Sequence, residues 1–346
     1  MKKVELKCNT PIVKGYLFYA FPLTIMGYNE KTEPWILSNF IQTCFDKDFL
    51  DSPVPFAFYS FDFSLTPWLN IQKLKRKTID DLNIDIISFL KSNLDNKCYV
   101  QVYLDEFYVP NRLSFRAKHF CHENLIAGYN DNTMTFDIMG FNEELSYKKT
   151  KITYEQIRSA YSSVRDLIRL ERMQQELHSE SYEFFNTIVV YQFNKHGHYL
   201  FDINTVLETL EDYIYGRNTS LRYSMIQDKW DRIYGIECYK YISKYLKELL
   251  RNNVGYDIRY LHNLWEHKML NTRRVQYMLR NGYLDIPSIL DQFSELEKLT
   301  LSFRNKMIKY ALTKEKKEIQ FIVEKLEWLE EEENKLIKKL ITNVIR

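Results

Sequence analysis

The chain has 346 residues, of which 45% are hydrophobic and 15% aromatic, enough for a folded core of one large domain or two ordinary ones. Lysine and arginine number 48 against 46 aspartate and glutamate, so the formal net charge is only +2. So small a charge provides no broad field for gripping a nucleic-acid backbone, and we do not expect a nucleic-acid partner.

The N-terminus opens with Lys2 and Lys3, but no apolar run of the kind found in a signal peptide follows them. Nowhere does the sequence contain an uninterrupted apolar stretch long enough to cross a bilayer. We therefore expect a cytoplasmic, soluble protein without a membrane partner.

Residues 1–150 have the composition of a mixed domain, with seven of the eight prolines and several short aromatic runs. Helices followed by strands, rather than alternating with them, favour an α+β domain in which helices pack on an antiparallel sheet. The expected helices lie within Pro11–Met26, Trp35–Asp46 and Asp80–Asn93, and the expected strands are Tyr99–Tyr108, Glu123–Tyr129 and Thr133–Met139.

Residues 151–346 show the spacing of amphipathic helices, with apolar side chains recurring three and four residues apart. We expect a helical bundle with segments near 153–185, 203–215, 219–251, 256–281 and 286–345. The last segment carries a coiled-coil-like seam in which Glu333 takes the place of one apolar residue. This seam predicts either a hairpin with the preceding helix or a homodimer contact.

Five scattered cysteines without a CxxC pair argue against a disulfide framework and a structural zinc site. His119, Cys121 and His122 are too close in sequence to converge on one metal ion, because neighbouring residues of a strand point to alternate sides. The sequence also lacks GxxxxGK[ST], GxGxxG and HExxH patterns, so we expect no bound cofactor or metal.

A histidine hairpin is the strongest chemical signal. His122 begins one predicted strand, Asn130-Asp131-Asn132 provide a turn, and Asp137 lies on the returning strand. In thiol enzymes a histidine takes the proton of a cysteine, and a carboxylate fixes the tautomer of the imidazole. We therefore predict His122 as a catalytic base and Asp137 as the group that orients it. The alternative is that both residues are ordinary polar groups of a surface hairpin.

The segment HFCHENLIAGY (119–129), together with DEFYVPNR (105–112), resembles the histidine segment of the papain-like family that includes the butirosin biosynthesis acyltransferase and the amide-forming N-acyltransferase of the closthioamide pathway. The stretches 234–246 and 260–279 look like the helical extension of the same group. The resemblance implies a papain-like catalytic domain over 1–150 and a helical domain over 151–346.

What this resemblance implies is an ATP-independent acyltransferase of peptide-antibiotic biosynthesis. An acyl group would pass from the thioester of an acyl carrier protein to an active-site cysteine and then to an amine acceptor, forming an amide. No ATP is needed, since a thioester is already activated. A cysteine peptidase of the same fold is a competing expectation.

The position of the nucleophile leaves two interpretations open. The resemblance implies a cysteine at the start of the first helix, around Lys14 to Tyr16, where the sequence has none. The nearest thiol is Cys8, ahead of Asn9, Thr10 and Pro11 as possible first residues of the helix. Either Cys8 is the nucleophile, or the chain has lost the thiol and serves as a non-catalytic scaffold.

Two polar clusters lie outside the histidine hairpin. The basic run Gln72–Lys77 is either a docking site for an acidic carrier protein or a solvated flank balanced by Asp80 and Asp81. The polar residues Glu266, His267 and Lys268 beside Trp265 predict a contact between helices rather than a catalytic site.

Overall fold

The structure is a computed structural model that describes residues 2–50, 52–59, 62–173, 185–224 and 231–345. The chain divides into two compact units. The sheet unit consists of Met1–Thr32 and Asp62–His198, and the helical unit consists of Glu33–Phe61 and Tyr199–Arg346. This division differs from a single boundary at residue 150, because each unit is built from two separate stretches of chain.

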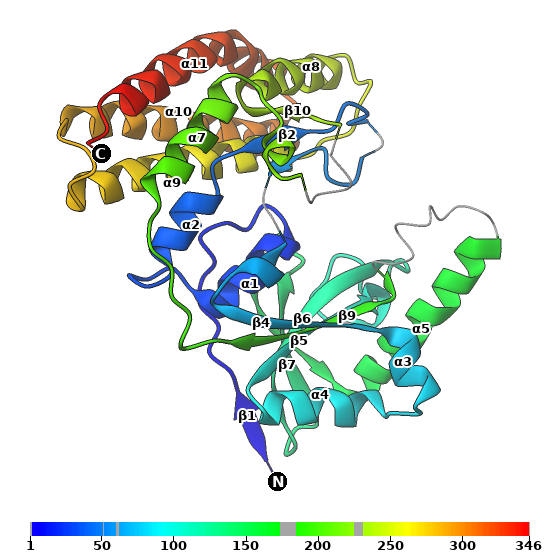
Figure 1. Ribbon diagram of the computed structural model, residues 1–346. Coiled ribbons are helices and arrows are strands. Elements are labelled where there is room, and N and C mark those ends of the chain that lie inside the picture. The colour runs from blue at the N-terminus through cyan, green and yellow to red at the C-terminus, as the bar shows by residue number, and fades with distance from the viewer. Residues whose placement is uncertain (1, 51, 60–61, 174–184, 225–230, 346) are drawn as a thin grey trace. The chain divides into compact units, whose positions relative to one another are not determined.

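The sheet unit contains an antiparallel sheet with the strand order β4-β9-β5-β6-β7-β8, and β1 pairs with the far end of β6 (Figure 1). The α+β class expected from the sequence is confirmed. The strands are β1 (Lys3–Glu5), β4 (Leu69–Lys75), β5 (Cys98–Asp105), β6 (Cys121–Asn130), β7 (Thr135–Phe141), β8 (Tyr147–Thr153) and β9 (Thr187–Phe193). The helices are α1 (Leu17–Met26), α3 (Arg76–Asp81), α4 (Ile86–Asp95) and α5 (Tyr154–Met173), with short 3-10 turns at η1 (Phe63–Leu65) and η2 (Glu106–Tyr108).

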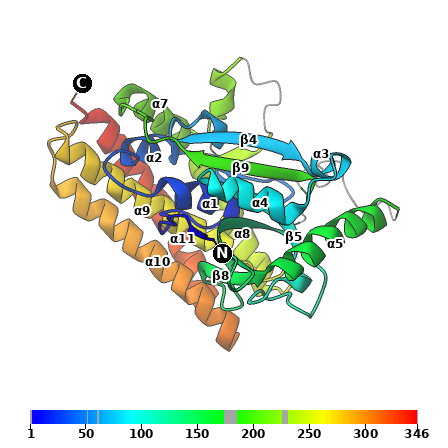
Figure 2. The ribbon, with the colours of Figure 1, turned by 90° about the horizontal axis from the view of Figure 1, so that it is seen from below.

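One face of this sheet forms the main core of the unit and is called the core face here. Val100, Val102 and Leu104 alternate along β5 and are fully buried, because successive side chains of a strand point to opposite faces. They pack with Ile126 and with residues of α4 and α5, which Figure 2 shows in front of the strands. Each such buried aliphatic side chain contributes roughly 1.5–3 kcal/mol.

The opposite face of the sheet is covered by α1 and is called the α1 face. Thr24 Oγ1 of α1 lies 2.8 Å from the hydroxyl of Tyr147 on β8, and the ring of Phe21 packs 6.3 Å from the ring of Tyr147. Cross-strand pairing aligns Met139 with Lys149 and Asp137 with Lys151, so these side chains belong to the same face as Tyr147.

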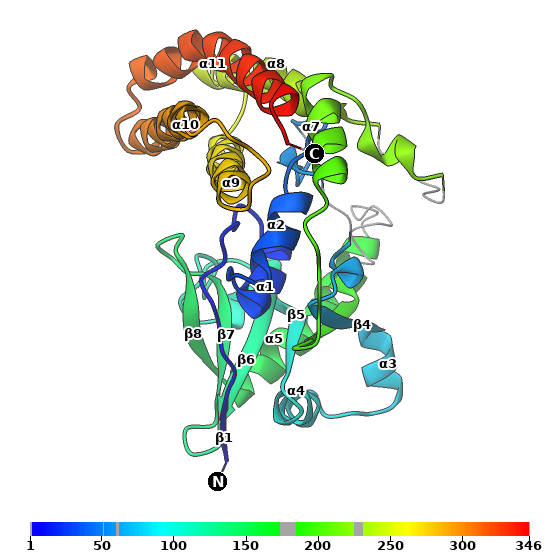
Figure 3. The ribbon, with the colours of Figure 1, turned by 60° about the vertical axis from the view of Figure 1, so that its left-hand side comes forward.

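The helical unit is built mainly from long helices joined by short turns. Consecutive helices α9, α10 and α11 lie side by side (Figure 3). The seam residues Ile319, Ile322 and Leu326 are buried within this single chain, where α11 packs on α10, α8 and α7. The apolar side chains of the seam are thus buried by a hairpin that α11 forms with the preceding helix and by α8 and α7. The helices are α2 (Glu33–Asn39), α7 (Ile203–Ile214), α8 (Cys238–Leu250), α9 (Arg259–Arg280), α10 (Ser288–Thr313) and α11 (Lys316–Thr342).

A small antiparallel sheet completes the helical unit, in the order β10 (Ile233–Tyr234), β2 (Thr43–Phe45) and β3 (Phe56–Phe58), with short 3-10 turns η3 (Thr219–Arg222) and η4 (Gly235–Glu237). Gly235 has φ +58°, and a Cβ there would lie 2.1 Å from the carbonyl oxygen of Tyr213. Only glycine fits this close approach of two backbones. Within the described residues, none of the helices combines the length and apolar composition needed to cross a bilayer.

Candidate active site

Cys8 lies beyond β1 in the sheet unit and is not at the start of a helix. Helix α1 begins at Leu17, after the N-cap residue Tyr16, so the expected start at Pro11 is not observed. The Sγ of Cys8 lies 3.7 Å from the carbonyl oxygen of Leu6. Burial outweighs the lowering effect of the Lys149 charge and, with smaller contributions from Asp137 and Glu5, raises the pKa of the Cys8 thiol to about 11. A thiol with this pKa is protonated near neutral pH and is a poor nucleophile.

The structure does not bring His122 and Asp137 together. In the β6–β7 hairpin, Asp137 pairs with Gly128, far along β6 from His122. His122 instead pairs across β5 with Leu104, which lies on the core face, whereas Asp137 lies on the α1 face. The predicted orienting carboxylate is therefore on the other side of the sheet from the predicted base.

Cys8 and His122 also have different charged surroundings. Lys149, Asp137 and Glu5 act on Cys8, whereas Glu106, Glu123 and Arg112 act on His122. Lys149 and Asp137 belong to the α1 face, and His122 to the core face. The three residues predicted as a triad are thus separated in the structure, and no proton path from Cys8 to His122 follows from their positions.

The carboxylate that contacts His122 is Glu106, in the turn that directly follows β5. His122 Nδ1 lies 3.2 Å from Oε1 of Glu106, and Nε2 lies 3.7 Å from Oε2 of Glu123. Burial lowers the pKa of His122, but the hydrogen bond to Glu106 and the negative charges of Glu123 and Glu106 outweigh it, so the pKa is raised above its ordinary value. His122 therefore carries its proton more often than an ordinary histidine.

Arg112 lies next to the His122–Glu106 pair on the core face of the sheet. Its guanidinium lies 3.6 Å from Glu106 and donates a hydrogen bond of 3.0 Å to the side-chain oxygen of Asn124. A Cβ at Gly140 would lie 2.7 Å from Nη2 of Arg112, so the glycine leaves the space that the guanidinium fills. Polar groups thus occupy the core face at the point where the apolar core ends.

A second histidine–carboxylate pair lies beside the first and was not predicted. His119 Nδ1 is 2.6 Å from Oδ2 of Asp105, the last residue of β5. Asp105 is fully buried and also accepts hydrogen bonds from the hydroxyl of Ser163 and from the backbone N–H groups of Phe107 and Phe120. Burial alone raises the pKa of Asp105, but these hydrogen bonds outweigh it and hold the pKa below its ordinary value.

His119 has the geometry of an oriented base. Its side chain is 48% exposed, and the ring of Phe107 stacks on it at 4.5 Å. In the described part of the chain, no group is hydrogen bonded to Nε2. Because ionised Asp105 accepts the Nδ1 proton, the lone pair of a neutral His119 is on Nε2, the nitrogen that can reach a substrate.

A simple signal for both pairs was present in the sequence. Asp105 and Glu106 lie near the end of one predicted strand, while His119 and His122 lie just ahead of the next. Antiparallel neighbours bring the end of one strand beside the start of the other, and the structure pairs Asp105 with Cys121. Two adjacent carboxylates therefore meet two histidines at one edge of the sheet.

The remaining thiols offer no alternative partner for these histidines. Cys44 and Cys238 belong to the helical unit and are buried; burial raises the pKa of Cys44 to about 11 and that of Cys238 well above its ordinary value. Burial also raises the pKa of the Cys98 thiol in the sheet unit. Cys121 alternates with His122 along β6 and points to the other face of the strand. Among the residues that the structure describes, no group of three His, Cys, Asp or Glu side chains is placed to hold a metal ion.

We expect the sheet unit to lose stability as the pH rises through the ordinary histidine pKa and past the raised folded-state pKa of His122. Because the folded-state pKa of His122 is raised, the stabilisation by its proton is complete below the ordinary histidine pKa and is lost as the pH passes the folded-state value. Urea unfolding at a series of pH values measures this loss. His122→Gln should flatten the dependence, whereas His196→Gln, at an exposed turn residue, should leave it unchanged. An identical slope in the wild type and His122→Gln would contradict the assignment.

Comparison with models of known protein families finds no match, and no curated protein matches the sequence. The fold and the site therefore define only a class: an α+β protein whose sheet unit carries two histidine–carboxylate pairs at one edge of the sheet.

Proposed function

We propose that this protein is a cytoplasmic, ATP-independent N-acyltransferase with a papain-like sheet unit, in which His119 oriented by Asp105 is the general base and no cysteine acyl-enzyme forms. The observation that carries this proposal is the 2.6 Å contact between His119 and the buried Asp105. The acyl-transfer class rests on the resemblance of segments 105–112, 119–129, 234–246 and 260–279 to the butirosin-type acyltransferase family.

The proposed reaction is a direct transfer. The nitrogen of an amine acceptor attacks the carbonyl carbon of the thioester, so a C–N bond forms and the C–S bond breaks. His119 Nε2 takes the proton that the amine nitrogen loses, and the same proton passes to the departing thiolate. The products are an amide and a free thiol, such as that of an acyl carrier protein, and no oxidant or nucleotide is consumed.

His119 is a better candidate base than His122 for two reasons. Asp105 holds only one nitrogen of His119, which leaves Nε2 available, whereas each ring nitrogen of His122 has a carboxylate nearby. The raised pKa of His122 also keeps it protonated more often, and a protonated imidazole cannot accept a proton. We therefore assign His122, paired with Glu106, the structural role of fixing the loop between β5 and β6.

The cysteine acyl-enzyme expected from the resemblance is not part of the proposal. Cys8 has a pKa of about 11 and lies with the charged groups of the α1 face. A nucleophilic cysteine needs its pKa lowered by a cation, an adjacent base or a helix N-terminus, and here the effects that raise it prevail.

A second candidate is the non-catalytic scaffold protein of papain-like fold. Cys8 and His122 lie on opposite faces of the sheet, and this favours the scaffold. The cysteine chemistry of papain-like enzymes needs the thiol and the histidine in contact. In that case both histidine–carboxylate pairs serve to fix the loop between β5 and β6.

One experiment separates the candidates. The protein is incubated with an N-acetylcysteamine thioester, with and without a diamine, while the amide, the hydrolysed acid and the intact protein mass are followed. Direct transfer predicts amide formation above background, no acyl adduct on the protein, unchanged activity in Cys8→Ala, and a loss of about 10²–10⁴-fold in His119→Ala. An adduct that disappears in Cys8→Ala would restore the cysteine mechanism. If neither amide nor acid forms, the scaffold protein is the remaining candidate. If the thioester is hydrolysed at the same rate with and without the diamine, the protein is a hydrolase.

A further inference from the structure

Helix α8 in the helical unit carries a line of exposed basic side chains. Lys240, Lys244, Lys247 and Arg251 follow one another at steps of four, three and four residues. At 100° per residue these positions lie within roughly 60° of one another, and the line is about 16 Å long. We call these four residues the α8 basic stripe.

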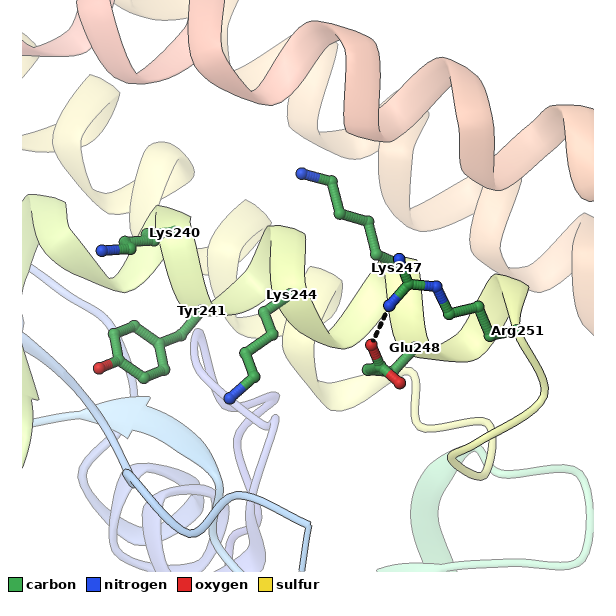
Figure 4. A pocket seen from close by; sticks show the side chains of 6 residues that line it. All are labelled: Lys240, Tyr241, Lys244, Lys247, Glu248 and Arg251. Atoms are coloured by element: carbon green, nitrogen blue, oxygen red, sulfur yellow. Dashed lines mark hydrogen bonds and ion pairs between the residues drawn. The ribbon is translucent and has the colours of Figure 1, made fainter.

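The stripe borders a pocket of about 370 Å³ that is also lined by Tyr241 and Glu248 (Figure 4). Glu248 is the only acidic group that lines this pocket, and its carboxylate already accepts hydrogen bonds from Arg251 at 2.6 Å and from Asn253 at 2.7 Å. The pocket therefore has four positive groups and one carboxylate along its lining.

Three of the four cations form no close ion pair with a described carboxylate, although the charge of Lys244 acts on Glu248 one turn further along the helix. Within the described residues, Lys240, Lys244 and Lys247 form no ion pair with a carboxylate. Other lysines of the helical unit are paired: Lys306 and Lys309 both contact Glu318, at 2.9 and 2.6 Å. What distinguishes the α8 basic stripe is that its four exposed cations lie on one side of the helix beside a single pocket.

Helix stability does not account for the stripe. Lys240 lies in the first turn of α8, where the positive end of the helix dipole disfavours a cation. Only Lys247 and Arg251, near the C-terminal end, gain from the dipole. Aromatic rings pack beside the stripe. Lys244 Nζ lies 5.4 Å from the ring of Phe49, and the ring of Tyr241 lies 5.4 Å from that of Phe45.

The basic run that stands out in the sequence is not comparable. Lys73 is paired with Asp62 at 2.6 Å and Lys77 with Asp81 at 2.7 Å. Arg76 is buried, stacks on the ring of Tyr161 and donates to two backbone carbonyl groups. Lys73, Arg76 and Lys77 therefore have partners within the sheet unit, whereas the cations of α8 are exposed along one side of a helix.

We propose that the α8 basic stripe docks the acidic face of a helix in a partner protein. Four cations spread over about 16 Å are too far apart for one phosphate group, but they match carboxylates at the same helical spacing on a second helix. The chain's net charge of +2 argues against a general nucleic-acid surface. Naming this partner as an acyl carrier protein rests on the proposed function; the docking of an acidic helix does not.

The test measures binding without any chemistry. A fluorescent, lactam-stapled helical peptide with glutamates at positions i, i+4, i+7 and i+11 is titrated with the full-length protein, and anisotropy is recorded at low and at physiological salt. We expect binding that weakens with salt, and about tenfold weaker binding to the triple variant Lys240→Glu/Lys244→Glu/Lys247→Glu. The control variant Lys316→Glu/Lys325→Glu/Lys338→Glu, with the same charge change on exposed lysines of α11, should change binding less than about twofold.

Three outcomes would overturn the proposal: no binding of the peptide, equal loss in both variants, or tighter binding of a single-stranded RNA of the same charge. A peptide of the same composition with scattered glutamates checks that spacing matters. If amide formation is found, the α8 triple variant should raise KM for a carrier-protein thioester but not for the N-acetylcysteamine thioester. Failure of the proposed function would leave the binding result intact, so the two proposals are judged separately.

Discussion

Glu333→Ala is expected to lower the free energy of unfolding of the helical unit by about 3–5 kcal/mol, because it leaves a buried ammonium group without its counter-charge. Glu333 is fully buried on α11 and contacts Lys268 Nζ at 2.6 Å. It also accepts hydrogen bonds from the hydroxyl groups of Tyr213 and Tyr239, both at 2.8 Å. Urea unfolding followed by far-UV circular dichroism measures the loss.

The neighbouring Glu332→Ala is the matched control. Glu332 is partly exposed and pairs with Lys335 at 2.7 Å, and such surface pairs contribute only about 0–1 kcal/mol. The double variant Lys268→Met/Glu333→Gln removes both charges and keeps an oxygen for the tyrosine hydroxyls, so it should recover much of the stability lost in Glu333→Ala. Equal effects of Glu333→Ala and Glu332→Ala would show that the buried pair is not important for stability.

The surroundings of Lys268 explain why this effect should be large. Its ammonium also donates 2.9 Å to Nδ1 of His267, whose Nε2–H donates to the carbonyl oxygen of Ile41. Burial and the neighbouring Lys268 charge hold the pKa of His267 well below its ordinary value, so His267 is neutral. Because His267 is neutral, the carboxylate of Glu333 provides the negative charge that stabilises the buried ammonium of Lys268. This confirms the expected contact between helices at His267 and Lys268.

Asp105→Asn is expected to reduce amide formation by about 10²–10⁴-fold. Enzymes with a histidine base lose activity on this scale when the carboxylate that orients the histidine is removed. An amide NH₂ facing Nδ1 of His119 favours the tautomer with its proton on Nε2, and that nitrogen then has no lone pair for the acceptor amine. Steady-state rates with the thioester and the diamine measure the effect, and unfolding curves show whether the variant is folded.

Glu106→Gln makes the same chemical change on the adjacent carboxylate, which contacts His122 rather than His119. Its rate should fall less than about tenfold if His119 is the base. A larger loss in Glu106→Gln than in Asp105→Asn would return the catalytic role to His122, as the sequence predicted.

The local parts of the fold were predictable from the sequence. The hairpin expected at Glu123–Tyr129 and Thr133–Met139 corresponds to β6 and β7, and the helix expected near 256–281 corresponds to α9. Strand β9 was missed because the chain after residue 150 was interpreted as a helical bundle, whereas β9 pairs with β4 and β5 of the preceding part. The run TIVVYQF nevertheless has the β-branched and aromatic composition of a strand, so a local signal was present.

The candidate site was predictable only in part. The hairpin register itself shows that Asp137 lies opposite Gly128, so counting residues from the turn would have separated Asp137 from His122. The protonation of Cys8, in contrast, depends on burial and on charges contributed by β1, β7 and β8. No local pattern around Cys8 reports the pKa that this three-dimensional environment produces.

The interleaving of the two units has a consequence for synthesis of the chain. Glu33–Phe61 emerges from the ribosome early, but the rest of its unit begins only at Tyr199. Strands β4 and β5 likewise wait for β9, which separates them in the finished sheet. Phe45, for example, therefore remains without Tyr241 and Tyr260, which contact it in the folded protein, while well over a hundred further residues are made. During this interval the nascent chain offers a surface for chaperones, and a fragment ending near residue 150 contains neither unit in full.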